Sequence, residues 1–361
     1  MYFLALPLLT GVFAKVVSAA PFTPTGGLDT NSSSPVYQPL SDFDFQSLNL
    51  ALYQEFLELD LFHHGLAEFS AQEFEFNNIT MDDQFIIEYM ADQELGHAIL
   101  LTNILGPNNA SKPCNYSYPV ETAQDFIQFS EMVTRVGEAG AYGFLEHLDS
   151  RAAAQLILQT VTVEARQEMI FRQLQGIFPM PFAFNPAITQ SMQWTLIAPF
   201  IVSCPAENNR VEFQNFPALN ITNNPNFTML SNSSGPTVSV NETAFSTPGQ
   251  SVSLSWESPG IPVGPNNSYT TNTTAGTPQF VAWISQLNTT YTPLTNVSNN
   301  TGVNTGVTQQ PGGTIYGDGT SLTFNGTLFV LVTDSNITVT PANISLLNSH
   351  VVAGPAVYRA G

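Results

Sequence analysis

Residues 80–105 read TMDDQFIIEYMADQELGHAILLTNIL, and this stretch decides the fold. Its apolar residues recur at the three- and four-residue spacing that is typical of an amphipathic helix. Thr80 is expected to cap the N-terminus of this helix, because a threonine side chain can accept a hydrogen bond from the first free backbone N–H groups. Asp82 and Asp83 follow in the first turn, where carboxylates interact favourably with the helix dipole.

Two titratable residues, Glu94 and His97, lie on the apolar side of this helix. A spacing of three residues places both side chains on one face, about one turn apart. Such a pair, directed into a helical bundle, binds one edge of a carboxylate-bridged di-metal site. A single Glu-x-x-His is a weak signal, because a partly exposed Glu beside a hydrogen-bonded His gives the same spacing. The hypothesis therefore depends on whether other helices bring carboxylates to the same level.

Three further helices are expected from the periodicity of the apolar residues, over 42–69, 122–148 and about 150–178. Asp149 and Ser150 form a break at which one of the two residues caps the fourth helix. Residues 70–79 form a short connection that suits antiparallel neighbours. Residues 106–121 show no periodicity and are long enough to run back along a bundle, so we expect them to form a crossover.

Counting from the helix ends places four carboxylates, Glu55, Glu94, Glu138 and Glu164, within about a turn and a half of one level, at a rise of about 1.5 Å per residue. These carboxylates and His97 are the predicted metal ligands. Gln167, one turn after Glu164, is a weak ligand or a group that orients one. The alternates are Glu58, one turn after Glu55, and Glu131, which lies nearer its helix end.

The composition is strongly acidic, with 28 acidic against 8 basic residues and a net charge of −20. No basic patch can form, which excludes nucleic-acid binding and binding to an anionic membrane surface. The acidity is compatible with attraction of cations and is equally explained by solubility.

At 361 residues with 43% hydrophobic content, the chain has room for two domains with cores of their own.

Several features predict export from the cell. Residues 1–19 resemble a secretory signal peptide, and 20–41 read as a disordered leader. No later run is long and apolar enough for a membrane span, and no lipid-anchor tail is recognised. We therefore expect an extracellular or cell-wall-associated protein. The expected N-glycans would be carried by sixteen Asn-x-Ser/Thr sequons, at Asn31, Asn78, Asn109, Asn115, Asn220, Asn226, Asn232, Asn241, Asn266, Asn272, Asn288, Asn296, Asn299, Asn325, Asn336 and Asn343.

The chain contains two cysteines, Cys114 and Cys204, each beside a proline or in loop-like sequence. In an oxidising compartment they are expected to form a disulfide, which would tie the crossover to the end of the helical region. Two free buried thiols are the alternative.

The composition changes after Cys204, where Gly, Asn, Thr, Ser and Pro become frequent. Residues 206–234 read as a linker, and 235–361 as a β-rich, glycosylated domain. Short alternating runs with turn signals between them favour a β-sandwich. Its acidic residues are scattered and suggest no catalysis. The runs predicted as strands are TVSVNETAF (237–245), SVSLSW (251–256), FVAWISQL (280–287), SLTFNGTLFVLVT (321–333), NITVTPANISLL (336–347) and HVVAGPAVY (350–358).

The helical region resembles the ferritin-like superfamily, and more closely the fungal secreted ferritin-like-domain proteins described as stress-response or sexual-development proteins. The resemblance covers roughly 42–205 and rests on the segments LNLALYQEFLELDLFHHGL (48–66), YMADQELGHAILLTNILG (89–106), GEAGAYGFLEHL (137–148) and VEARQEMIFRQLQGIFPMPFAF (163–184). It implies a ferritin-like four-helix bundle, followed here by the β-sandwich-like region. It also implies one or two bound metal ions, iron or manganese.

One position departs from the di-iron pattern of that superfamily, because Gln167 stands where a second His is found. Glutamine is a poor ligand for these metals, which puts the second ion in doubt. His63, His64 and His147 are read as surface or helix-end residues rather than as substitutes. Two hypotheses follow: a metal-binding bundle with a di-metal oxidase-type activity, and a non-enzymatic extracellular protein with a vestigial metal site. No oligomeric state can be read.

Overall fold

The computed structural model describes residues 34–225, 236–238, 244–300, 302–312 and 326–361. The predicted signal peptide, most of the leader and residues 226–234 of the linker lie outside these residues, as do the sequons at Asn31, Asn226, Asn232, Asn241 and Asn325. Tyr37–Gly361 forms one compact unit. The division into a helical and a β-rich domain stays a prediction.

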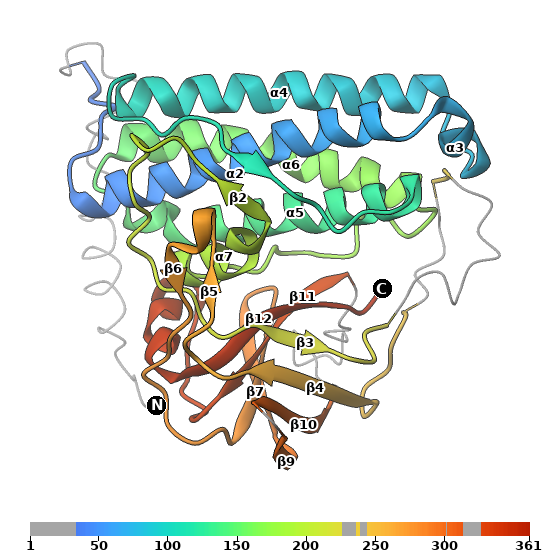
Figure 1. Cartoon of the computed structure of the whole chain (residues 1–361), viewed down its shortest axis with the longest axis vertical. Helices are drawn as coiled ribbons and strands as arrows, with labels where there is room; N and C mark the ends of the chain where they lie inside the picture. Colours follow the sequence, from blue (N-terminus) through green and yellow to red (C-terminus); the bar gives the residue numbers. More distant parts are fainter. Residues whose placement is uncertain (1–33, 226–235, 239–243, 301, 313–325) are drawn as a thin grey trace, which may run out of the picture. The chain divides into compact units, whose positions relative to one another are not determined.

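Four long helices lie side by side and form the bundle (Figure 1). All four begin within one residue of the predicted start; the first two end within one residue of the predicted limit, and the last two end four residues earlier than expected. Each follows a Ser or Thr whose side chain accepts a hydrogen bond from a backbone N–H of the first turn, which is why the helices begin at these points. The helices are α2 (Asp42–Glu68), α4 (Met81–Leu105), α5 (Ala123–Phe144) and α6 (Arg151–Leu174).

The side-chain pairs between helices establish their directions. Glu55 of α2 meets His97 of α4, and Asn49, one and a half turns earlier, accepts from Ser111 beyond the end of α4, so α2 and α4 are antiparallel. A Cβ on Gly65 would meet Phe126, and one on Gly137 would meet Gln54, so α5 is also antiparallel to α2. The crossover therefore makes α4 and α5 parallel, as predicted.

The connection between α2 and α4 is not a plain loop, because it contains the short helix α3 (Ala71–Phe76). Ser70 and Glu73 form a capping box at its start, in which each side chain meets the other's backbone N–H. A short 3-10 helix (Leu145–His147) extends α5. A further helix, α7 (Gln190–Ile197), follows the bundle and was not predicted.

The predicted disulfide between Cys114 and Cys204 is confirmed. It lies beside a two-stranded pair of β1 (Asn115–Tyr116), in the crossover, and β2 (Ile201–Ser203), after α7. The bond therefore ties the crossover to the segment that leaves the bundle.

Reduction of this disulfide is expected to destabilise the protein by about 4 kcal/mol, because it closes a long loop in the unfolded chain. The two cysteines are 90 residues apart in sequence. Urea unfolding of the Cys114→Ser/Cys204→Ser double variant against the parent measures the difference. A single Cys114→Ser variant leaves one free thiol, so the double variant is the cleaner comparison. An unchanged midpoint would contradict the expectation.

Two four-stranded antiparallel sheets make up most of the β-rich region, with strand orders β3-β4-β10-β9 and β12-β11-β7-β8, and a separate two-stranded sheet joins β5 (Pro262–Val263) to β6 (Tyr269–Thr270). Val252, Leu254 and Trp256 of β4 alternate with partly exposed residues and share one core with Trp283 of β7 and Val330 of β11, so the sheets form a sandwich as expected. The strands are β3 (Leu219–Ile221), β4 (Ser251–Glu257), β7 (Phe280–Ser285), β8 (Asn288–Pro293), β9 (Thr295–Asn300), β10 (Val303–Gln309), β11 (Thr327–Thr333) and β12 (Val351–Arg359).

Some strand predictions differ from the structure. The run 336–347 was predicted as a strand, but 341–350 forms a 3-10 helix that begins with a proline and a capping box. Strand β3 falls within the predicted linker 206–234. Strands β8, β9 and β10 were also missed, because their Asn- and Thr-rich sequence reads as loop. In the run 237–245, residues 239–243 lie outside the described residues, and the described ones are not strand.

One hydrophobic core joins the bundle to the sandwich. The unpredicted helix α7 supplies its bridging side chains, Trp194 and Ile197, which are almost completely buried. The same hydrophobic core holds side chains of α2, α5, β7 and β11, including Leu57, Val136, Ala282, Ile284, Phe329 and Leu331.

Among the described residues, no helix is long and apolar enough to cross a membrane.

Candidate functional site

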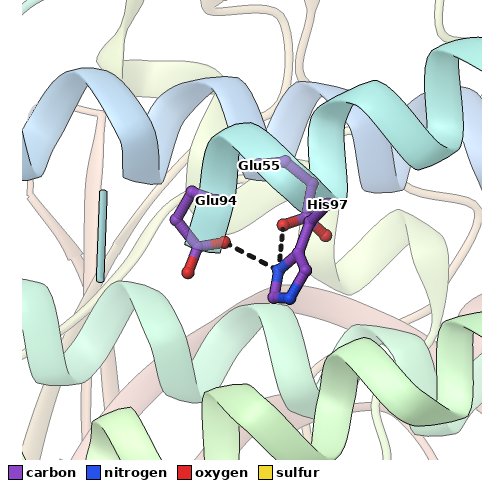
Figure 2. Close-up of side chains that lie close together, drawn as sticks. All are labelled: Glu55, Glu94 and His97. Carbon is purple, nitrogen blue, oxygen red and sulfur yellow. Dashed lines mark hydrogen bonds and ion pairs between the residues drawn. The ribbon is translucent and has the colours of Figure 1, made fainter. Parts of the chain in front are cut away.

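Glu55 of α2 and Glu94 and His97 of α4 meet inside the bundle (Figure 2). The Nδ1 atom of His97 lies 3.0 Å from an Oε atom of Glu94 and 3.1 Å from one of Glu55. All three side chains are buried, and one potential ligand atom from each lies within 4.8 Å of the other two. Ligands about 2.1 Å from one ion are separated by distances of this size.

Helix α6 completes this side of the site with Glu164 and Gln167. An oxygen of Glu164 lies 4.0 Å from His97 Nδ1. The amide nitrogen of Gln167 donates hydrogen bonds to Glu94 and to Gln93. Gln167 therefore orients a carboxylate instead of presenting a second imidazole.

Glu58, predicted only as an alternate, also belongs to this group. It is fully buried one turn after Glu55; the side chains of Thr134 and Gln54 lie close enough to oppose the rise of its pKa, but neither carboxylate oxygen has a well-formed hydrogen bond among the described residues. One oxygen of Glu164 and the amide oxygen of Gln167 are likewise buried and unpaired. These atoms are all acceptors, so the unsatisfied potential of the site is for a cation or protons.

The charges of the site perturb each other. Burial raises the pKa of Glu55, Glu58 and Glu164 well above the usual range, and neighbouring carboxylates add to the rise. Burial by itself would lower the pKa of His97, but its hydrogen bond to Glu94 and the surrounding carboxylates outweigh that effect and raise it. The metal-free site therefore retains protons that a bound cation would displace.

The metal-free protein is expected to lose stability as the pH rises from about 4.5 towards neutrality. The carboxyl pKa values are raised above the 4.5 of an ordinary Glu, so above that pH the folded state binds more protons than the unfolded state, and the free energy of unfolding falls. The raised pKa of His97 acts in the same direction, but only above about pH 6.5, where an ordinary imidazole loses its proton. Each retained proton contributes a slope of about 1.4 kcal/mol per pH unit.

Denaturant unfolding of chelator-treated protein at pH 5 and pH 7 measures this effect. The Glu164→Gln variant is the control, because it removes one of the proton-binding groups and should flatten the profile. Equal slopes in parent and variant would contradict the assignment.

Glu138 and Glu131 of α5 do not join the group around His97, although sequence levels placed Glu138 there. A guanidinium nitrogen of Arg135 lies 2.6 Å from Glu138, and a second one contacts Glu168 of α6. Arg172 of α6 lies 3.1 Å from Glu131. The two buried arginines therefore hold the carboxylates of α5 in ion pairs. Glu138 was expected beside the other ligands, but it is paired with Arg135 instead.

Arg135, Arg172 and Glu168 were missed by sequence reasoning, and all three are nearly fully buried. The sequence did contain a signal for these ion pairs: the chain has only eight Lys and Arg residues, and two of them, Arg135 and Arg172, lie on helix faces directed into the bundle. His63, His64 and His147 are exposed, as expected.

The donor set fits a divalent transition metal. It consists of carboxylate oxygens and one imidazole nitrogen, a combination that suits iron or manganese. Both cysteines are in the disulfide, so no thiolate is present to favour a softer ion. Access is restricted: His97, whose side chain is 10% exposed, is the most exposed of the triad.

Comparison with known proteins agrees with this architecture. The profile of the ferritin-like domain matches residues 43–176, which span α2 to α6. Protein rds1 of Schizosaccharomyces pombe is 53% identical over 364 residues, which cover 98% of this chain and 89% of the relative. The chain therefore belongs to the family of fungal ferritin-like-domain proteins that includes Protein rds1.

Proposed function

We propose that this chain is a secreted metal-binding glycoprotein whose bundle holds a divalent iron or manganese ion between Glu55, Glu94 and His97. One observation carries the proposal: these three ligands, from two helices, converge in the interior together with unpaired acceptor atoms of Glu58 and Glu164. Buried carboxylates without donors cost several kcal/mol each, and a cation offsets that cost.

The surroundings favour one ion over two. Gln167 uses its amide nitrogen on Glu94, and the α5 carboxylate that would bridge a second ion, Glu138, is paired with Arg135. The cationic guanidinium supplies the positive charge that a second ion would bring to that side of the bundle. A stoichiometry near one ion per chain follows.

An oxidase-type activity is the finer part of the proposal. A bound iron or manganese ion would supply one-electron redox chemistry. The chain's own residues hold the site closed: Gln167 orients Glu94, whose side chain is fully buried, and the side chains of His97, Glu55 and Glu164 are only slightly exposed. A substrate larger than a small molecule or an ion would therefore not reach the ligands without movement of α4.

Secretion is supported by the sequons and the disulfide. All the described sequon asparagines are exposed except Asn343, which is partly buried and whose side-chain oxygen accepts the backbone N–H of Thr340 at the start of a 3-10 helix. Glycans could therefore be attached at these positions without disturbing the core. Disulfides persist in oxidising, extracellular compartments. Association with the cell wall, and with stress or sexual development, is part of the same proposal.

A second candidate is a non-enzymatic extracellular protein in which the metal site is vestigial. The observation that favours it is the replacement of metal ligands by Gln167 and by arginine ion pairs. In that case the carboxylates around His97 would hold protons, and the bundle would serve as a scaffold.

Metal analysis by mass spectrometry tests the proposal on protein secreted from a fungal host and purified without chelators. About one equivalent of iron or manganese is expected, and oxygen consumption with added iron(II) or manganese(II) then tests turnover. A metal content near zero, with no metal uptake on reconstitution, would favour the second candidate, in which the bundle is a scaffold.

A further inference from the structure

We propose that an N-glycan on Asn78 packs its first N-acetylglucosamine against Phe76 and the surface groove beside it, and so stabilises the corner between α3 and α4. The inference rests on the secreted, glycosylated state proposed above. It goes beyond that state by assigning a contact, and a structural role, to one particular sugar.

Phe76 is the unexplained feature of this corner. Its side chain is 88% exposed at the end of α3, the highest exposure among the large hydrophobic residues of the described chain, while Phe74 beside it is fully buried. Phe76 also lines a groove of about 420 Å³ between α3 and the start of α5. Its walls include the side of Ala123 and the polar residues Gln72, Asn77 and Gln124. The Phe76 ring therefore presents an apolar face to solvent at the edge of this groove.

Asn78 lies two residues after Phe76 and begins the sequon Asn78-Ile79-Thr80. It is exposed and has a left-handed backbone with φ of 59°, while Ile79 is buried and Thr80 caps α4. The backbone thus turns at Asn78, between the end of α3 and the start of α4. A sugar attached there is tethered within two residues of the Phe76 ring.

The chemistry of the two groups is complementary. One face of a pyranose ring presents C–H groups, which pack on an aromatic ring, while its hydroxyl and amide groups point to water or to polar side chains. The groove offers this combination, an aromatic wall with amide side chains around it. A short tether lowers the entropy lost on contact, because the sugar is already held beside the ring.

Other sequons lack this arrangement. The residue two positions before Asn109 is Pro107, and that before Asn288 is Gln286. The side-chain nitrogen of Asn115 donates to Ser203 across the β1–β2 pair, and that site also has no aromatic residue two positions before it. Asn109 and Asn288 therefore serve as controls for the loss of a glycan, because both are exposed sequon asparagines on the same chain. Asn266 is also matched to Asn78 in backbone conformation, with φ of 52° and Gly264 two positions before it, so Asn266→Gln measures the cost of glutamine at a left-handed position.

Two measurements test the contact on the secreted full-length protein. Glycopeptide mass spectrometry determines whether Asn78 is occupied. Thermal unfolding is then compared for the parent, Asn78→Gln, Phe76→Ala and the double variant. We expect each single variant to lower Tm by about 2 °C, a size typical for the loss of one modest contact in a domain of this length. The double variant should fall no further than either single one.

The controls separate the contact from general effects. Asn109→Gln should leave the effect of Phe76→Ala unchanged, and Phe85→Ala, an exposed aromatic of α4 at 63% exposure, should not interact with Asn78→Gln. Phe76→Tyr keeps the ring and should retain the parent Tm. Phe76→Ala should also speed hydrogen exchange over 70–80 only when the glycan is present.

The possible failures are distinguishable. An occupied Asn78 with additive effects of the two substitutions would overturn the contact, and would leave Phe76 as a surface for another protein. An empty Asn78 with other sequons occupied would overturn it as well. Glycans absent from every sequon would instead refute the glycosylated state on which the inference rests. Metal content should stay unchanged in all of these variants.

Discussion

Glu94→Gln is expected to reduce bound metal from about one equivalent to less than a tenth. Glu94 is fully buried, and its two oxygens contact His97 Nδ1 and the Gln167 amide, so the carboxylate lies at the centre of the ligand group. The amide keeps the size of the side chain but loses the charge and half of its acceptor capacity. Metal analysis of the purified variant measures the loss.

The stability of this variant should depend on metal in an informative way. An ion present at 100 times its Kd stabilises the parent by about 2.7 kcal/mol, and the variant should lose this increment. Without metal the variant should be as stable as the parent or more so, because one of several mutually repelling buried carboxylates has been removed.

Glu88→Gln is the matched control, because Glu88 is an exposed glutamate on the same helix. It should retain both metal and stability. Full metal retention in Glu94→Gln would show that the ion is bound elsewhere.

Arg135→Met is expected to destabilise the protein by about 3–5 kcal/mol, the largest change predicted for a single side chain here. Arg135 is 4% exposed and forms ion pairs with Glu138 and Glu168, so its removal leaves two buried carboxylates without a countercharge. Its guanidinium also stacks over Phe182 and donates to Asn185. Denaturant unfolding measures the loss.

A rescue experiment tests whether the loss of stability in Arg135→Met comes from unpaired charge or from lost packing. Adding Glu138→Gln and Glu168→Gln to Arg135→Met should recover most of the stability, because the orphaned charges are then removed as well. Arg151→Met replaces an exposed arginine and should change the free energy of unfolding by less than about 0.5 kcal/mol. A triple variant no more stable than Arg135→Met would indicate that the aromatic stacking dominates.

The helical architecture could be predicted from sequence because its signals are local. Apolar spacing and a Ser or Thr before each helix define the long helices to within a few residues. The strands β4, β7, β11 and β12 were also recognised from short apolar or alternating runs. By contrast, β8 to β10 are held by pairing with neighbouring strands, and their Asn- and Thr-rich sequence carries little propensity of its own.

The sequence by itself determined the candidate ligands of α2, α4 and α6, because helical periodicity and counting from capped ends place Glu55, Glu94 and Glu164 at one level. Only the tertiary structure decided which charged groups pair at that level. Glu138 lies near the predicted height, but Arg135, one turn away on its own helix, neutralises it together with Glu168 of α6. Ion pairing between helices depends on side-chain direction and burial, which no periodicity along a single helix encodes.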